Sequence, residues 1–161
     1  MRRVLKTGRR SRSGLTLVEL IVAFTILLIL TSMAVPLARG NVRRIQERQL
    51  REALHEMRAA IDKYKDLADA GKLGIQKTDG FGYPESLKAL VDGVKGSGQA
   101  ADTKLKFLRR IPLDPMTNTR EWGVRSMQDD PTSMSWGGQN VFDVYTKSEN
   151  KAADGTSYSE W

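Results

Sequence analysis

Residues 15–38 read LTLVELIVAFTILLILTSMAVPLA, and Glu19 is the only ionisable side chain in this run. The part from Leu15 to Pro36 has 22 residues. As a helix it would measure roughly 33 Å, enough to cross a bilayer core of about 30 Å. The run therefore predicts a transmembrane helix. A carboxylate inside such a helix costs on the order of 3 kcal/mol. Anchoring the chain in a membrane therefore does not by itself explain the presence of Glu19.

The segment before this run is basic. Six basic residues and no acidic ones precede Gly14: Arg2, Arg3, Lys6, Arg9, Arg10 and Arg12. Without these six, the 26 basic residues of the chain fall to 20, against 19 acidic residues. Positive charge beside an apolar segment tends to stay in the cytoplasm, so we expect the N-terminus there and the rest of the chain across the membrane. The remainder has no basic patch with interleaved aromatic residues, so nucleic acid is not an expected partner.

A cleaved secretory signal is the alternative interpretation of this N-terminus. Small residues in Ser32-Met33-Ala34 and Pro36-Leu37-Ala38 would suit signal peptidase. However, the apolar run is longer than the 7–15 residues of a usual signal core, and Glu19 would lie inside that core. The pattern therefore favours a retained helix.

Helical periodicity continues after Arg39. Apolar residues recur at spacings of 4, 3, 4, 3 and 4: Leu50, Leu54, Met57, Ile61, Tyr64 and Ala68. This stripe predicts an amphipathic helix packed on its own domain, with charges such as Glu47 and Arg51 on the other faces. Gly71 and Gly74 are plausible stop signals. One helix is thus expected from about Leu15 to about Ala70.

The C-terminal half is rich in turn residues and predicts short elements. PESLKALVDG (84–93) predicts a helix opened by Pro84 and closed near Gly93. KFLRRI (106–111) predicts a strand, or an extended segment ending at Pro112. REWGVRSM (120–127) and NVFDVYT (140–146) predict an antiparallel hairpin.

The predicted fold class is therefore α+β, with a long N-terminal helix packed on a small antiparallel β-sheet. The helix has a transmembrane half and an amphipathic half. The expected segments are a basic leader (1–14), the transmembrane helix (15–38), its amphipathic continuation (39–72) and a globular α+β region (73–161).

Chemistry typical of enzymes is absent from the sequence. There is no cysteine, so disulfides and thiol nucleophiles are excluded. The single histidine, His55, lies among charged residues, which is typical of a solvated helix position. No nucleotide-binding, hydrolase or metalloprotease motif occurs. The loop SENKAAD (148–154), followed by GTSYSE, is rich in oxygen ligands for a hard cation such as calcium. It lacks EF-hand spacing, and a solvated polar tail is the alternative.

The run GLTLVEL (14–20), preceded by a short basic leader, resembles the N-terminus of type IV pilins and pseudopilins. The resemblance implies that a prepilin peptidase cuts between Gly14 and Leu15 and methylates the new amine of Leu15. It also implies that Glu19, the fifth mature residue, meets the amine of a neighbouring subunit during assembly. Leu15 departs from the phenylalanine that is usual at this position.

Two further stretches narrow the resemblance to one subfamily. FLRRIPLDPMTN (107–118) resembles a segment of the major pseudopilins of type II secretion systems. The sequence from Phe142 to Trp161 is similar to the C-terminal calcium-binding region of that family. The resemblance implies calcium as a cofactor and Glu149, Asn150 and Asp154 as candidate ligands. Type IVa pilins usually close this region with a disulfide, which this chain cannot form.

The resemblance implies a pilin fold and a structural subunit, not an enzyme. The expected protein is a single-pass inner-membrane pseudopilin with a cytoplasmic N-terminus and a periplasmic C-terminal region, which polymerises into a pseudopilus that drives protein export. Expected partners are prepilin peptidase, copies of the chain in a helical filament, minor pseudopilins, the inner-membrane assembly platform and the inner membrane itself. Alternatives are a type IV pilin or minor pilin for motility, adhesion or DNA uptake, and a singly anchored periplasmic binding domain.

Overall fold

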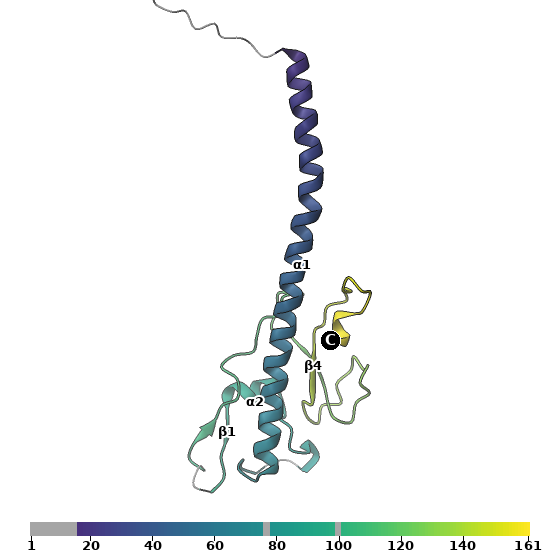
Figure 1. Ribbon diagram of the computed structural model, residues 1–161. Helices are drawn as coiled ribbons and strands as arrows, with labels where there is room; N and C mark the ends of the chain where they lie inside the picture. Colours follow the sequence, from purple (N-terminus) through teal and green to yellow (C-terminus); the bar gives the residue numbers. More distant parts are fainter. Residues whose placement is uncertain (1–15, 76–77, 99–100) are drawn as a thin grey trace, which may run out of the picture. The chain divides into compact units, whose positions relative to one another are not determined.

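The computed structural model describes residues 16–75, 78–98 and 101–161, and for residues 33–40 it describes the backbone without the side chains. Its main element is α1 (Leu17–Asp69), a helix of 53 residues (Figure 1). The predicted long helix is thus confirmed over the described residues. Contacts divide the chain into two units, Met1–Arg43 and Arg44–Trp161, and α1 contributes to both.

The N-terminal unit contributes only helix to the described structure. No helix in the part of the chain that the structure describes is long and apolar enough to cross a membrane. The predicted transmembrane segment, residues 15–38, is described only in part, because Leu15 and the side chains of residues 33–40 lie outside the described set.

The core of the C-terminal unit is built on the predicted apolar stripe of α1. Five of its six members are buried: Leu50, Leu54, Met57, Ile61 and Tyr64. The sixth, Ala68, is partly buried against the same cluster. Burying an aliphatic side chain of this size stabilises the fold by about 1.5–3 kcal/mol, so this stripe is a main anchor of the unit. The prediction that it packs on its own domain is confirmed.

Two small antiparallel sheets are present where one was expected. The first pairs β1 (Val94–Lys95) with β2 (Lys104–Leu105), and the second pairs β3 (Gly123–Arg125) with β4 (Asp143–Tyr145). The second sheet is the predicted hairpin. Its register places Gly123 opposite Tyr145, where a Cβ on Gly123 would lie 2.2 Å from a ring atom of Tyr145. The close approach of the ring therefore requires a glycine.

The other elements are short. Helix α2 (Leu87–Asp92) begins three residues after Pro84, because the Ser86 hydroxyl accepts the Ala89 N–H at 3.3 Å and caps the helix. Residues 106–111 form no strand, and Phe107, Arg109 and Arg110 lie in bends of the chain. The N–H groups of Phe107 and Leu108 both donate to the carbonyl of Leu90, which leaves no ladder to a neighbouring strand. Two 3₁₀ turns, η1 (Thr78–Gly80) and η3 (Tyr158–Glu160), complete the description.

Candidate functional site

The first turn of α1 places Glu19 at a helix N-terminus. The Thr16 hydroxyl accepts the Glu19 N–H at 3.3 Å, and the Thr16 carbonyl accepts the Leu20 N–H at 3.1 Å. Thr16 is therefore the N-cap, and Glu19 occupies the third helical position. Thr-Leu-Val-Glu has the sequence pattern of a capping box, of which the structure shows the bond from the Glu19 N–H to the Thr16 hydroxyl. This site also favours an anion, because the N–H groups of the first turn point toward it.

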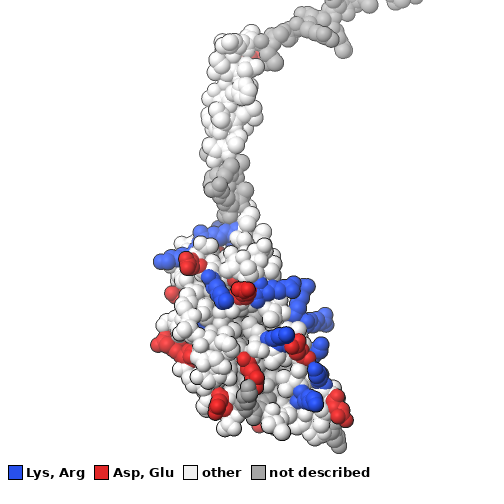
Figure 2. Space-filling view, turned by 180° about the vertical axis from the view of Figure 1, so that it is seen from behind, with Lys and Arg blue, Asp and Glu red and all other residues white. Residues whose placement is uncertain are grey.

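The surface that follows Glu19 is apolar on every side. Eleven large apolar side chains between Leu17 and Leu30 are exposed in the single chain: Leu17, Val18, Leu20, Ile21, Val22, Phe24, Ile26, Leu27, Leu28, Ile29 and Leu30. The five consecutive members from Ile26 to Leu30 alone encircle the helix, since each residue advances by about 100°. Figure 2 shows this stretch almost free of charge. A helix that is apolar all round is normally covered by lipid or by other helices.

Three hydroxyl groups of this stretch are hydrogen-bonded to carbonyls of the helix itself. Thr25 and Thr31 each donate to the backbone carbonyl four residues earlier, at 2.7 Å. Ser32 donates to the carbonyl of Ile29 at 2.8 Å. These bonds reduce the cost of placing hydroxyls in an apolar environment. Glu19 is the only charged group between residues 16 and 32.

The processing residues cannot be placed. Gly14 and Leu15 lie outside the described residues, as does the whole basic leader. The predicted cut between them and the methylation of Leu15 stay predictions. What the structure adds is that α1 begins at Leu17, two residues after the predicted mature N-terminus.

The segment from Phe107 to Asn118 is organised by a buried carboxylate. Asp114 is fully buried and accepts hydrogen bonds from the Met116 N–H at 2.8 Å and from the Thr117 hydroxyl at 3.0 Å. The Thr146 hydroxyl, just after β4, donates to the same carboxylate at 2.5 Å. Asp114 thereby fixes its own turn and joins it to the second sheet. The sequence offered one signal for this role, an Asp-Pro pair at a turn.

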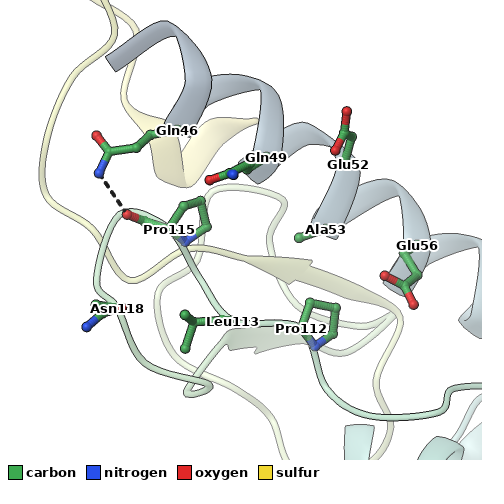
Figure 3. A pocket seen from close by; sticks show the side chains of 9 residues that line it. All are labelled: Gln46, Gln49, Glu52, Ala53, Glu56, Pro112, Leu113, Pro115 and Asn118. Atoms are coloured by element: carbon green, nitrogen blue, oxygen red, sulfur yellow. Dashed lines mark hydrogen bonds between the residues drawn. The ribbon is translucent and has the colours of Figure 1, made fainter. Parts of the chain in front are cut away.

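A groove of ≈ 520 Å³ lies between this segment and α1 (Figure 3). Gln46, on the helix, donates its side-chain N–H to the carbonyl of Pro115 at 3.2 Å and closes one end. Glu52 and Glu56 line the helix side of the groove, and Leu113 lines the other. The described lining of the groove contains no histidine, cysteine, serine, threonine or lysine. His55 is exposed, as predicted, and lies at a different pocket beside Trp161.

Residues 148–161 contact α1 through charged side chains that lie outside its apolar stripe. Glu47 accepts the Tyr158 hydroxyl at 2.7 Å, and the guanidinium of Arg51 lies 4.2 Å from the ring centroid of Trp161. Glu47 and Arg51 lie outside the buried apolar stripe, as predicted, but both also contact the C-terminal segment. Their partners lie about a hundred residues away in sequence, and local spacing gives no signal for them.

The predicted calcium ligands occupy separate positions in this segment. Glu149 is exposed and lines a shallow pocket with Lys147, Ser148, Ser157 and Ser159. Asp154 lies in a tight turn, where one carboxylate oxygen accepts the Thr156 N–H at 2.9 Å and its hydroxyl at 2.7 Å. The hydroxyl and N–H of Thr156 hold the pKa of the Asp154 carboxyl below its ordinary value of 3.8.

The backbone oxygens of the same loop are also engaged. The carbonyl of Asn150 accepts the Tyr158 N–H at 3.2 Å, and the carbonyl of Thr156 accepts the Ala152 N–H at 2.7 Å. Over the described ranges, no three His, Cys, Asp or Glu side chains gather closely enough to hold a metal ion. Calcium usually takes six to eight oxygen ligands, and here it would have to displace these bonds. As placed, the residues do not fit a calcium ion, and calcium binding stays a prediction.

Two comparisons with known proteins agree with this description. Residues 9–35 match the family described as the prokaryotic N-terminal methylation motif. The chain is 30% identical over 118 residues to the type II secretion system core protein G of Pseudomonas aeruginosa, which covers 71% of this chain and 75% of that relative. No solved structure matches the chain.

These matches decide the family. The methylation motif implies processing by prepilin peptidase and anchoring in the inner membrane before assembly. The similarity to core protein G extends well beyond the motif, over most of both chains. The long helix packed on small antiparallel sheets is consistent with both. The chain therefore belongs to the pseudopilin family that includes type II secretion system core protein G, and it is a structural protein, not an enzyme.

Proposed function

We propose that this chain is a filament-forming subunit of a type II secretion pseudopilus. Prepilin peptidase would cut between Gly14 and Leu15 and methylate Leu15. The mature chain would wait in the inner membrane with its C-terminal region in the periplasm, and then polymerise with copies of itself. Minor pseudopilins and the inner-membrane assembly platform are the expected partners in this process.

The exposed apolar surface from Leu17 to Leu30 is the single observation that carries this proposal. Nothing in the described residues covers it, and it is too large to be left in water. Lipid would cover it before assembly, and the equivalent helices of other subunits would cover it in the filament. A filament of packed helices thus accounts for a surface that a plain periplasmic domain would not need.

Glu19 has a specific role in this proposal. Cleavage after Gly14 creates a positive amine four residues before Glu19 in sequence. In a filament core the carboxylate of one subunit would pair with the amine of its neighbour, and this pair would set the register between subunits. An unpaired charge in such a core is strongly unfavourable, so each subunit that joins would favour the paired position.

Processing and assembly are tested together by isolating fibres. N-terminal sequencing of the fibre subunit is expected to begin at a methylated Leu15. Gly14→Val should block the cut, because the peptidase site must accept a residue without a bulky side chain, and the precursor should then accumulate at its full size. A mature-size band from that variant would contradict the proposed site.

The secretion role is tested by deleting the gene. We expect exported enzymes to accumulate in the periplasm, while surface motility and DNA uptake remain at wild-type levels. Loss of motility with normal export would instead indicate a type IV pilus subunit. A chain that starts at Leu15 but never enters fibres would indicate a singly anchored domain.

A further inference from the structure

We propose that the segment from Ser148 to Trp161 is closed onto α1 by a seam of three α1 side chains, Glu47, Arg51 and Arg58, without calcium and without a disulfide. Residues 47, 51 and 58 are separated by four and seven positions, so their side chains share one face of the helix. This inference concerns how the C-terminal region is held together, and it does not depend on the secretion role.

Arg58 makes the most contacts of the three. Its Nε donates to the Asp143 carboxylate at 2.7 Å. Its Nη2 donates to two carbonyl oxygens, that of Val144 at 3.1 Å and that of Trp161 at 2.8 Å. A planar guanidinium can hold several acceptors at once in a fixed geometry. One side chain of α1 therefore fixes both strand β4 and Trp161.

Asp143 is shared between two arginines. Its second carboxylate oxygen lies 3.4 Å from Nη1 of Arg125 on β3. Arg125 is buried and also donates to the Ser159 carbonyl at 3.4 Å. Two guanidinium groups, those of Arg58 and Arg125, therefore share the Asp143 carboxylate.

The other two seam residues contact the aromatic side chains of η3 and Trp161. The Glu47 carboxylate accepts the Tyr158 hydroxyl at 2.7 Å, and the Tyr158 and Trp161 rings pack edge to face at 4.9 Å. Arg51 lies over the Trp161 ring at 4.2 Å, within the range of a cation–π interaction. Tyr158 is buried by these contacts.

The loop between Asn150 and Tyr158 closes on itself. Lys151 and Ser157 form an antiparallel bridge, and the Asp154 carboxylate caps the turn through Thr156. The Thr156 hydroxyl also accepts the indole N–H of Trp161 at 3.1 Å. The turn is thereby linked to Trp161, which Arg58 and Arg51 also contact.

The experiment compares hydrogen exchange of the full-length chain in detergent, with millimolar calcium chloride or with EGTA. Peptides that cover residues 148–161 are followed by mass spectrometry. For the wild type we expect the same exchange rates in both solutions. For Arg58→Ala we expect exchange in this segment to be faster by on the order of tenfold in both solutions, because hydrogen bonds to three partners are lost.

Two matched variants test whether the effect is specific to Arg58 and whether calcium has a part in it. Arg48→Ala removes an exposed arginine of α1 that has no side-chain partner among the described residues, and it should leave the segment unchanged. Asp154→Asn keeps an acceptor for Thr156 but removes a carboxylate charge that would favour a calcium ion, and it should exchange like the wild type in both solutions.

Either of two outcomes would overturn the proposal. One is slower exchange of the wild-type segment in calcium than in EGTA, with the difference lost in Asp154→Asn, which would establish a calcium site. The other is wild-type exchange in Arg58→Ala. The comparison of the wild type in the two solutions needs no substitution, so the calcium part is decided even if a variant fails to fold.

Discussion

Glu19 brings a charge to the first turn of α1, and one substitution can remove that charge while keeping the size of the side chain. Glutamine serves a capping box as well as glutamate does, but it carries no charge for a neighbour's amine. We therefore expect Glu19→Gln to insert and to be cut normally. Its yield of sheared fibres should fall by roughly tenfold or more, because an amine buried without its partner is strongly unfavourable. The measurement is an immunoblot of the sheared and cellular fractions.

Thr16→Ala is the matched control at this end of the helix. It removes the hydroxyl that caps α1, at a cost of about 1 kcal/mol, and keeps the charge of Glu19. Fibre yield should change little, because the surrounding apolar contacts hold the helix in place. If Glu19→Gln assembled like the wild type while Thr16→Ala did not, Glu19 would matter for capping alone.

At the scale of elements, the sequence predicts those helices and strands whose pattern of apolar residues repeats regularly. The apolar stripe of α1 continues for more than four turns, so its helix and its buried face follow from spacing alone. Alternation predicts the β3–β4 hairpin equally well. Strands β1 and β2 have two residues each, too few to show alternation. The seam on α1 was missed because Glu47 and Tyr158 are 111 residues apart.

The turn between β3 and β4 should be sensitive to acid. One oxygen of Asp129 accepts the N–H groups of Ser126 at 2.7 Å and Gly137 at 3.0 Å, and these bonds hold the pKa of its carboxyl below the ordinary value of 3.8. The pKa of Asp130 is lowered in the same way, by the hydroxyl and N–H of Thr132. A lowered folded-state pKa contributes stability that is present above pH 3.8 and is lost as the pH falls through the lowered value.

We therefore expect the amides of Ser126 and Gly137 to lose protection as the pH falls below 3.8, after correction for intrinsic exchange rates. NMR exchange measurements on the two amides follow this directly. Asp129→Ala should show the same loss already at neutral pH, and acid should add little. Protection that is constant through this range in the wild type would show that the two bonds do not stabilise the turn.

At the scale of the whole molecule, the chain separates a surface for assembly from a domain that folds on its own core. Among the residues whose side chains the structure describes, the buried apolar ones all lie between Leu50 and Tyr158, whereas those of residues 16–32 are all exposed. On the face that Figure 2 shows, the C-terminal unit carries side chains of both charges, as expected for a surface in water. Its fold therefore should not depend on residues 1–43.

A fragment of residues 44–161 tests this separation. It retains every core residue, the seam and both sheets, so we expect cooperative thermal unfolding and a monomer in detergent-free buffer. A fragment of residues 59–161 is the control. It lacks Leu50, Leu54 and Met57, each of which would cost about 2–5 kcal/mol if truncated, against a total stability of about 5–15 kcal/mol. Circular dichroism and sedimentation should find the first fragment folded and the second unfolded. Non-cooperative melting of the first fragment would mean that the helix before Arg44 is needed to hold the stripe of α1 in place.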